Sequence, residues 1–173
     1  MNWQDHIRVN RVKKGTIAEN FVQEKLQEAG WVVYRPAGRH KVDFICEKKN
    51  EFVAVDVKAK ARRMYYDDTG IDARDLEVYK QLPLPVYLVF VDDITGTTYG
   101  ESIAYLCIAR RIGKYTYPMF SGHYVYFPLS AMKPLWKIPT EILQALRDVT
   151  ERKKDYEPAR VQAIKEASEK WQD

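Results

Sequence analysis

The chain has 173 residues and a mass of 20.3 kDa, which is the size of one domain. Hydrophobic residues make up 46% and charged residues 30%, and these values exclude a disordered or fibrous chain. No apolar run reaches the roughly 18 residues of a membrane span, and the N-terminus lacks the apolar centre of a signal peptide. We therefore expect a cytoplasmic protein without membrane contact, in which Cys46 and Cys107 are reduced core residues.

Positive charge is concentrated in the first third of the chain. Residues 1–63 hold 14 Lys and Arg against 8 Asp and Glu, whereas residues 64–138 and 139–173 each hold 7 against 8. The first third therefore has a formal charge of +6, and each of the other parts has a charge of −1. Such clustering suits a polyanion such as nucleic acid, because Lys and Arg displace the counterions of phosphates. An ordinary solvated surface is the alternative.

The hydrophobic pattern predicts an α/β fold, with a mixed central sheet flanked by helices. The predicted elements, in chain order, are a helix over 14–29 that ends at Gly30, strands over 31–36, 42–47 and 51–59, a short helix over 73–82, strands over 85–91, 102–109 and 124–128, and helices over 139–156 and 159–171. Residues 60–72 are expected to be irregular. We divide the chain into one domain, residues 1–138, and a C-terminal helical extension of that domain, residues 139–173.

Acidic and basic side chains gather on the hairpin formed by strands 42–47 and 51–59. In the second of these strands, VAVDVKAK, alternation places Asp56 and Lys58 on the face opposite the valines. Pairing of the two strands would bring Asp43 near Asp56. Two carboxylates about 4 Å apart repel by about 4 kcal/mol at an effective dielectric of 20, so such a site usually holds a positive charge. Lys58 could supply that charge, and so could Mg2+ or Mn2+, which prefer oxygen ligands and assist phosphodiester hydrolysis. A surface ion pair is the alternative.

Together with the preceding helix, these residues form a pattern that resembles a known family. The matching segments are Gly15-Thr16-Ile17-Ala18-Glu19, Arg35-Pro36-Ala37-Gly38, Val42-Asp43 and Val55-Asp56-Val57-Lys58. They resemble the PD-(D/E)xK nuclease superfamily and, within it, the archaeal Holliday junction resolvases and small phage or prokaryotic nucleases. The resemblance covers residues 14–92 and implies a restriction-endonuclease-like core. Val42 and Asp56 depart from the motif, in which proline and often glutamate occupy these positions.

The resemblance implies a role for each matching side chain. Asp43 and Asp56 would bind Mg2+ or Mn2+, with the Val57 carbonyl as a further ligand. Lys58 would position or activate the attacking water, and Glu19 would hold a metal-bound water or a second ion. For Glu19 the alternative is an acid favoured near a helix N-terminus by the helix dipole.

Other residues are candidates for lining the site or for binding DNA. Tyr79 and Gln81, on the helix after the lysine strand, could bind phosphate or water, although Tyr79 could instead pack inward. The candidates for contacting DNA are Lys13, Lys14, Arg35, Arg39, His40, Lys41, Lys60, Arg62 and Arg63. The three histidines are too scattered in sequence to form a zinc site.

A tyrosine-rich segment over 114–127, next to Arg110, Arg111 and Lys114, has two interpretations. Aromatic side chains beside cations can stack on unpaired bases, but they are more often core or interface residues. The C-terminal helices could cap the sheet or form a homodimer contact.

The sequence therefore predicts a Mg2+-dependent deoxyribonuclease, an endonuclease of a bacterial, archaeal or phage-infected cell, with branched or junction DNA as one candidate substrate. A nucleic-acid-binding or inhibitory module on the same fold, without catalysis, is the alternative. A purely structural or interaction protein is a third reading, and it predicts no binding of divalent metal.

Overall fold

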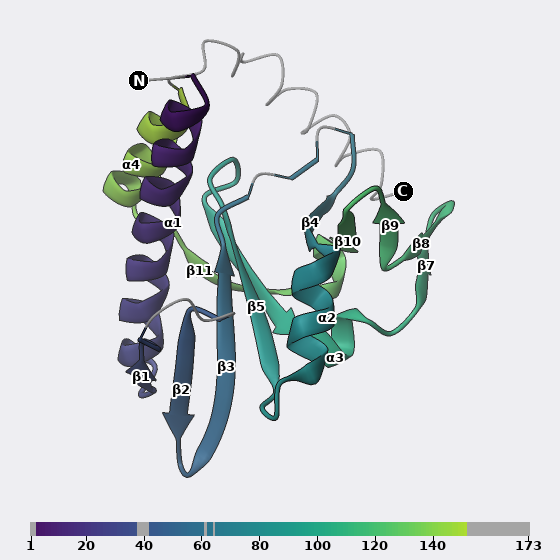
Figure 1. Cartoon of the computed structure of the whole chain (residues 1–173), viewed down its shortest axis with the longest axis horizontal. Coiled ribbons are helices and arrows are strands. Elements are labelled where there is room, and N and C mark those ends of the chain that lie inside the picture. Colours follow the sequence, from purple (N-terminus) through teal and green to yellow (C-terminus); the bar gives the residue numbers. More distant parts are fainter. Residues whose placement is uncertain (1–2, 38–41, 61, 64, 152–173) are drawn as a thin grey trace.

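The apolar strands pair into one six-stranded sheet with the order β1-β2-β3-β5-β6-β11 (Figure 1). This computed structural model describes residues 3–37, 42–60, 62–63 and 65–151. The helices are α1 (Trp3–Glu28), α2 (Ala73–Gln81), α3 (Ile103–Leu106) and α4 (Thr140–Glu151). The strands are β1 (Val32–Tyr34), β2 (Phe44–Lys48), β3 (Glu51–Lys58), β4 (Asp68–Asp72), β5 (Val86–Asp92), β6 (Thr97–Ser102), β7 (Arg110–Ile112), β8 (Tyr115–Tyr117), β9 (Met119–Ser121), β10 (Tyr124–Pro128) and β11 (Lys133–Lys137).

The central sheet is mixed, as predicted. β3 and β5 run parallel, whereas the β1-β2, β2-β3, β5-β6 and β6-β11 pairs are antiparallel. The parallel pair requires a crossover, and α2 lies within it. Helices lie against both faces of the sheet, so the predicted α/β class is confirmed (Figure 1). Within the described residues, no helix has the length and apolar character needed to cross a membrane.

Each face of the central sheet has its own hydrophobic core, because β3 and β5 are buried on both sides. On one face, α1 and α4 cover Val55, Val57 and Val89, and Phe21 and Leu146 are fully or nearly fully buried there. On the other face, α2, α3, β4 and β10 cover the remaining side chains of β3 and β5. Asp56 lies on this second face, since it alternates with the valines that contact α1.

A second, three-stranded sheet with the order β4-β10-β9 packs beside α2, and β7 and β8 form a separate hairpin next to it (Figure 1). Tyr126 of β10 pairs with Gly70 of β4. A Cβ atom at Gly70 would lie 2.7 Å from the Tyr126 ring and 2.8 Å from the Val125 carbonyl oxygen. Only glycine therefore lets the tyrosine ring lie against the β4 backbone.

The structure differs from the sequence prediction in several elements. The strand predicted over 102–109 is wrong: β6 ends at Ser102, whose hydroxyl accepts a hydrogen bond from the Tyr105 amide and caps α3. The irregular segment predicted over 60–72 contains β4, which is held by pairing with β10 rather than by its own sequence pattern. Helix α1 begins well before residue 14. The helix predicted over 159–171 lies outside the described residues.

Candidate active site

Asp43 stands at the open end of the β2-β3 hairpin, opposite its turn. The last ladder pair is Phe44 with Val55, and one residue further the Asp43 amide donates to the Val55 carbonyl oxygen over 3.1 Å. The Asp43 carboxylate accepts a hydrogen bond of 2.7 Å from the Val57 amide. The N–H and C=O of one strand residue point to the same side, so the Val57 carbonyl is also directed toward the Asp43 side of β3. The Asp43 carboxylate is also near enough to Asp56 for its charge to raise the pKa of Asp56.

Asp56 and Lys58 form an ion pair on the β3 face that α2 covers. Lys58 Nζ lies 2.8 Å from Asp56 Oδ2 and 3.3 Å from an oxygen of Asp75. Burial raises the pKa of Asp56 to about 6, because Lys58 only partly offsets the desolvation and Asp43 adds repulsion. Burial alone would lower the pKa of Lys58, but its two carboxylate partners raise it above its ordinary value. Lys58 is therefore a cation at neutral pH, held between two acids.

Glu19 reaches the site from α1. Burial raises the pKa of the Glu19 carboxyl, and Asp43 raises it further, whereas Arg35 and Lys58 lower it. The guanidinium of Arg35 lies 3.5 Å from Glu19, donates to Gln23 and Asn20 on the same helix, and lies over the Phe44 ring. Arg35 thus ties the chain after β1 to the helix face that carries Glu19. The four acidic and basic groups of the sequence motif are close enough to influence one another's charge.

Two further residues of α2 face the site, and sequence reasoning found one of them. Tyr79 is buried in the core next to α2, yet its hydroxyl helps to lower the pKa of Asp56 and its ring lies 5.9 Å from Lys58 Nζ. Asp75 was missed, although it lies four residues before Tyr79 and so on the same face of a helix. Gln81 is exposed at the last residue of α2. At about 100° per residue it points roughly 200° away from Tyr79, so the structure does not bring it to Asp56.

The donor set suits a hard divalent cation. Asp56 Oδ2 is buried, and the Lys58 ammonium lies 2.8 Å from it. Lys58 offsets only part of the cost of burying this carboxylate, because the pKa of Asp56 stays raised, and a divalent cation would offset more of it. The described residues contain no group of three or more His, Cys, Asp and Glu that could hold a metal. Two carboxylates and a backbone carbonyl nevertheless fit Mg2+ or Mn2+, which keep several waters in their shell.

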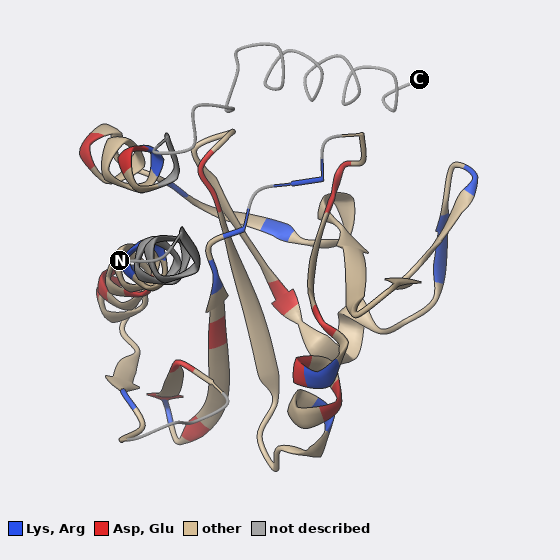
Figure 2. Cartoon of the chain, turned by 45° about the horizontal axis from the view of Figure 1, so that its top comes forward, with Lys and Arg blue, Asp and Glu red and all other residues tan. Residues whose placement is uncertain are grey.

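The basic residues proposed for DNA contact have different environments. Arg62 is buried, donates to Asp92, Asp67 and the Tyr99 hydroxyl, and is thus not available to a phosphate. This corrects the expectation for Arg62, because its acidic partners neutralise it inside the protein. Lys14 forms an ion pair of 2.6 Å with Asp93. Lys13 and Arg35 are exposed, whereas Arg39, His40 and Lys41 lie outside the described residues. Figure 2 shows Lys and Arg along the segment that follows β3.

No protein-family model matches the chain. Among solved structures, the chain is similar to Hjc, a Holliday junction resolvase from the archaeal hyperthermophile Archaeoglobus fulgidus, with 15% identity and a TM-score of 0.49 over 76% of this chain and 96% of that chain. It is also similar to D212, a nuclease from a fusselovirus, with 17% identity and a TM-score of 0.45 over 84% of this chain and 95% of that chain. A bacterial homing endonuclease, I-Ssp6803I, matches with 15% identity and a TM-score of 0.44 over 82% of this chain and 94% of that chain. At these identities the likeness concerns the fold alone.

Proposed function

We propose that this protein is a metal-dependent endonuclease that hydrolyses DNA phosphodiester bonds at the Asp43, Asp56, Lys58 and Glu19 site. The observation that carries the proposal is the convergence of Asp43 and Asp56 at the open end of the hairpin, with the lysine of the same strand beside them. A surface ion pair would not require burial, yet Asp56 is only 4% exposed. Keeping a second carboxylate beside a buried one destabilises the fold, so a charged ligand is the simplest reason for this arrangement.

The residues divide the chemistry among themselves. Asp43, Asp56 and the Val57 carbonyl would hold Mg2+ or Mn2+, which supplies Lewis-acid polarisation of the phosphate when bound. Lys58, protonated because of its acidic partners, would stabilise the negative charge that develops on the phosphate oxygens. Glu19, whose pKa is raised by burial and by Asp43, would accept a proton from the attacking water. Asp75 and Tyr79 act as positioning residues, since the Asp75 carboxylate and the Tyr79 ring lie next to the Lys58 ammonium and the Tyr79 hydroxyl acts on Asp56.

Cleavage of labelled DNA tests the proposal. Purified protein is incubated with Mg2+ or Mn2+, and separately with EDTA, on a four-way junction, a flapped duplex, a plain duplex and a single strand. We expect metal-dependent cutting that Asp56→Asn and Lys58→Met each reduce by at least about 100-fold. The substrate that is cut fastest decides whether the enzyme resolves branched DNA or cuts more generally.

Matched controls come from charged residues outside the site. Glu51 begins β3 at the opposite end of the hairpin, and Lys137 lies on β11; both are exposed. Glu51→Gln and Lys137→Met should cut as the wild type does. DNA binding by the wild type without cutting in either metal would contradict the nuclease proposal and favour the binding module.

A further inference from the structure

Three cations and four tyrosine rings form a continuous row that begins two residues after Lys58, with two rings between one cation and the next. Lys60 Nζ lies 4.7 Å from the centroid of the Tyr124 ring, and the Tyr124 ring is 6.2 Å from the Tyr126 ring. The Arg63 guanidinium lies between two rings, 3.8 Å from that of Tyr126 and 4.0 Å from that of Tyr66. The row continues to Tyr115, whose ring centroid lies 5.2 Å from that of Tyr66, and ends at Lys114, whose Nζ lies 5.3 Å from the Tyr115 centroid. We call this set the aromatic row: Lys60, Tyr124, Tyr126, Arg63, Tyr66, Tyr115 and Lys114.

The row is built from three separate parts of the chain. Its members come from the segment after β3, from β10 and from the β7-β8 hairpin. Tyr124 and Tyr126 lie on the face of β10 that points away from the core, because the intervening Val125 is fully buried. The row therefore runs along the outer face of the small sheet, starting beside the candidate active site. Figure 2 shows basic residues both on the segment after β3 and at the hairpin.

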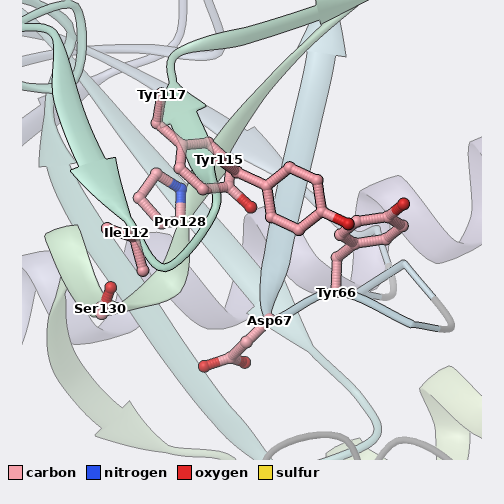
Figure 3. Close-up of a pocket in the computed structure, with 7 residues that line it drawn as sticks. All are labelled: Tyr66, Asp67, Ile112, Tyr115, Tyr117, Pro128 and Ser130. Carbon is pink, nitrogen blue, oxygen red and sulfur yellow. The ribbon is translucent and has the colours of Figure 1, made fainter. Parts of the chain in front are cut away.

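A pocket of about 100 Å3 lies at the far end of the row (Figure 3). The rings of Tyr66 and Tyr115 line it side by side, Ile112 and Pro128 give it apolar lining, and Asp67 adds a carboxylate. This volume is well below the roughly 300 Å3 at which sites for drug-sized ligands begin. The pocket thus suits one planar group of a larger ligand rather than a whole small molecule.

Charge and exposure show which members of the row can meet a ligand. Arg63 makes hydrogen bonds with the buried Asp68, so its guanidinium serves as a rigid plane rather than as a free charge. Tyr124 is 43% exposed, and Lys114 is exposed at the hairpin tip. Flat rings with lysines at both ends match an unpaired nucleic-acid strand, whose bases stack on aromatic rings and whose phosphates attract cations. A duplex hides its base faces and does not use such rings.

We propose that the aromatic row binds an unpaired stretch of DNA strand next to the phosphate that is cut. Tyr124, and Tyr115 at the pocket, stack on bases, while Lys60 and Lys114 contact the backbone. The proposal rests on the nuclease function proposed above and adds its substrate class, which is DNA that contains a single-stranded segment.

Fluorescence anisotropy in EDTA tests the row separately from catalysis. The probes are a labelled DNA single strand, a blunt duplex of the same length and an RNA strand of the same sequence. We expect the wild type to bind the DNA single strand most tightly. Tyr124→Ala and Tyr115→Ala should each weaken this binding about tenfold or more, whereas Tyr124→Phe, which keeps the ring, should bind as the wild type does. Lys114→Gln should also reduce the salt dependence, lowering the slope of log K against log salt by about 0.7.

Tyr87→Ala is the matched control. Tyr87 is an exposed tyrosine, 39% accessible, on the opposite face of the central sheet from the aromatic row. This variant should bind the single strand as tightly as the wild type. Equal binding of duplex and single strand, a preference for RNA, or unchanged binding by folded Tyr124→Ala and Tyr115→Ala would overturn the proposal for the row. The outcomes of the two proposals can be told apart. Metal-dependent cutting without single-strand binding would contradict only the proposal for the aromatic row. Single-strand binding without cutting would contradict the nuclease proposal and leave the row as a binding site for single-stranded DNA.

Discussion

At the scale of single residues, Asp56 has the most unusual environment in the candidate site. Its carboxylate is buried, lies near a second carboxylate, and keeps a raised pKa even though the Lys58 ammonium pairs with it. Without a bound cation, such a group lowers the stability of the fold at neutral pH. Sites that bind ions commonly accept this cost, because the groups that serve function are not the groups that maximise stability.

The pH dependence of stability should reveal this cost. The pKa of Asp56 rises from 3.8 to about 6 on folding, so between about pH 4 and pH 6 the folded chain binds more protons than the unfolded chain. The contribution of Asp56 to the unfolding free energy therefore decreases as the pH rises through this window, by up to about 3 kcal/mol. Asp56→Asn, which carries no charge, should be more stable than the wild type by about 1–3 kcal/mol at pH 7 and similar at pH 4.

Urea unfolding at the two pH values, without divalent metal, measures this difference. Glu51→Gln, an exposed change on the same strand, serves as the control and should leave the pH profile unaltered. A variant Asp56→Asn that is less stable than the wild type at pH 7 would show that the Lys58 pairing outweighs the burial of the carboxylate.

Individual site residues could be predicted when local sequence determined their position. Asp43, Asp56 and Lys58 follow from strand alternation and a short hairpin, so the structure brings them together where pairing through the turn would place them. The expectation for Arg62 failed because its partner Asp92 is 30 residues away on another strand. Charge alone cannot distinguish a buried guanidinium from one that faces solvent, since that difference depends on contacts distant in sequence.

At the scale of elements, strands with a clear apolar run were predictable, and strands without one were not. β6 and β11 were missed although they have six and five residues, whereas β1, with three residues, was predicted. β3, β5 and β10 have apolar runs whose length and pattern identify a strand. β7, β8 and β9 have three residues each, too few for any periodicity. The run Ile103-Ala104-Tyr105-Leu106 is apolar without alternation, and such a run fits a buried helix as well as a strand. The Ser102 side chain, which caps the first turn, favours the helix over the strand.

Two glycines should respond in opposite ways to alanine substitution. Gly15 lies inside α1, and the nearest atom to an added Cβ would be 3.7 Å away, an ordinary contact. Gly15→Ala should therefore raise the unfolding free energy by about 0.5–1 kcal/mol, because alanine loses less conformational entropy in a helix. Gly70→Ala should lower it by about 1–3 kcal/mol, because the new Cβ would meet the Val125 backbone at 2.8 Å.

The midpoints of urea unfolding for the two variants, measured beside the wild type, check this prediction. Because the Tyr126 ring also lies against Gly70, Gly70→Ala should in addition weaken binding of the single strand to the aromatic row. Equal stability of Gly70→Ala and the wild type would mean that the β4-β10 pair can separate without cost.

At the scale of the whole molecule, a divalent cation should stabilise the fold through the hairpin end. A ligand that binds only the folded state adds about 2.7 kcal/mol at a concentration 100 times its Kd. For a chain of this size that corresponds to a rise in Tm of roughly 5–10 °C. Thermal unfolding with increasing Mn2+ should show this rise for the wild type and for Glu51→Gln, and little or none for Asp43→Asn. An equal rise in all three proteins would place the bound ion elsewhere and would support a structural role for the Asp43 and Asp56 cluster.

The two arginines that follow β3 have a consequence for how the molecule measures its substrate. Arg62 ties this segment to Asp92 of the central sheet, and Arg63 ties it to Asp68 of the small sheet. The lysine strand and the row of tyrosines are thereby fixed to one another as parts of a single rigid frame. If both proposals hold, the distance between the bound bases and the cleaved phosphate is fixed. The cut then falls at a constant number of nucleotides from the unpaired bases, whatever their sequence.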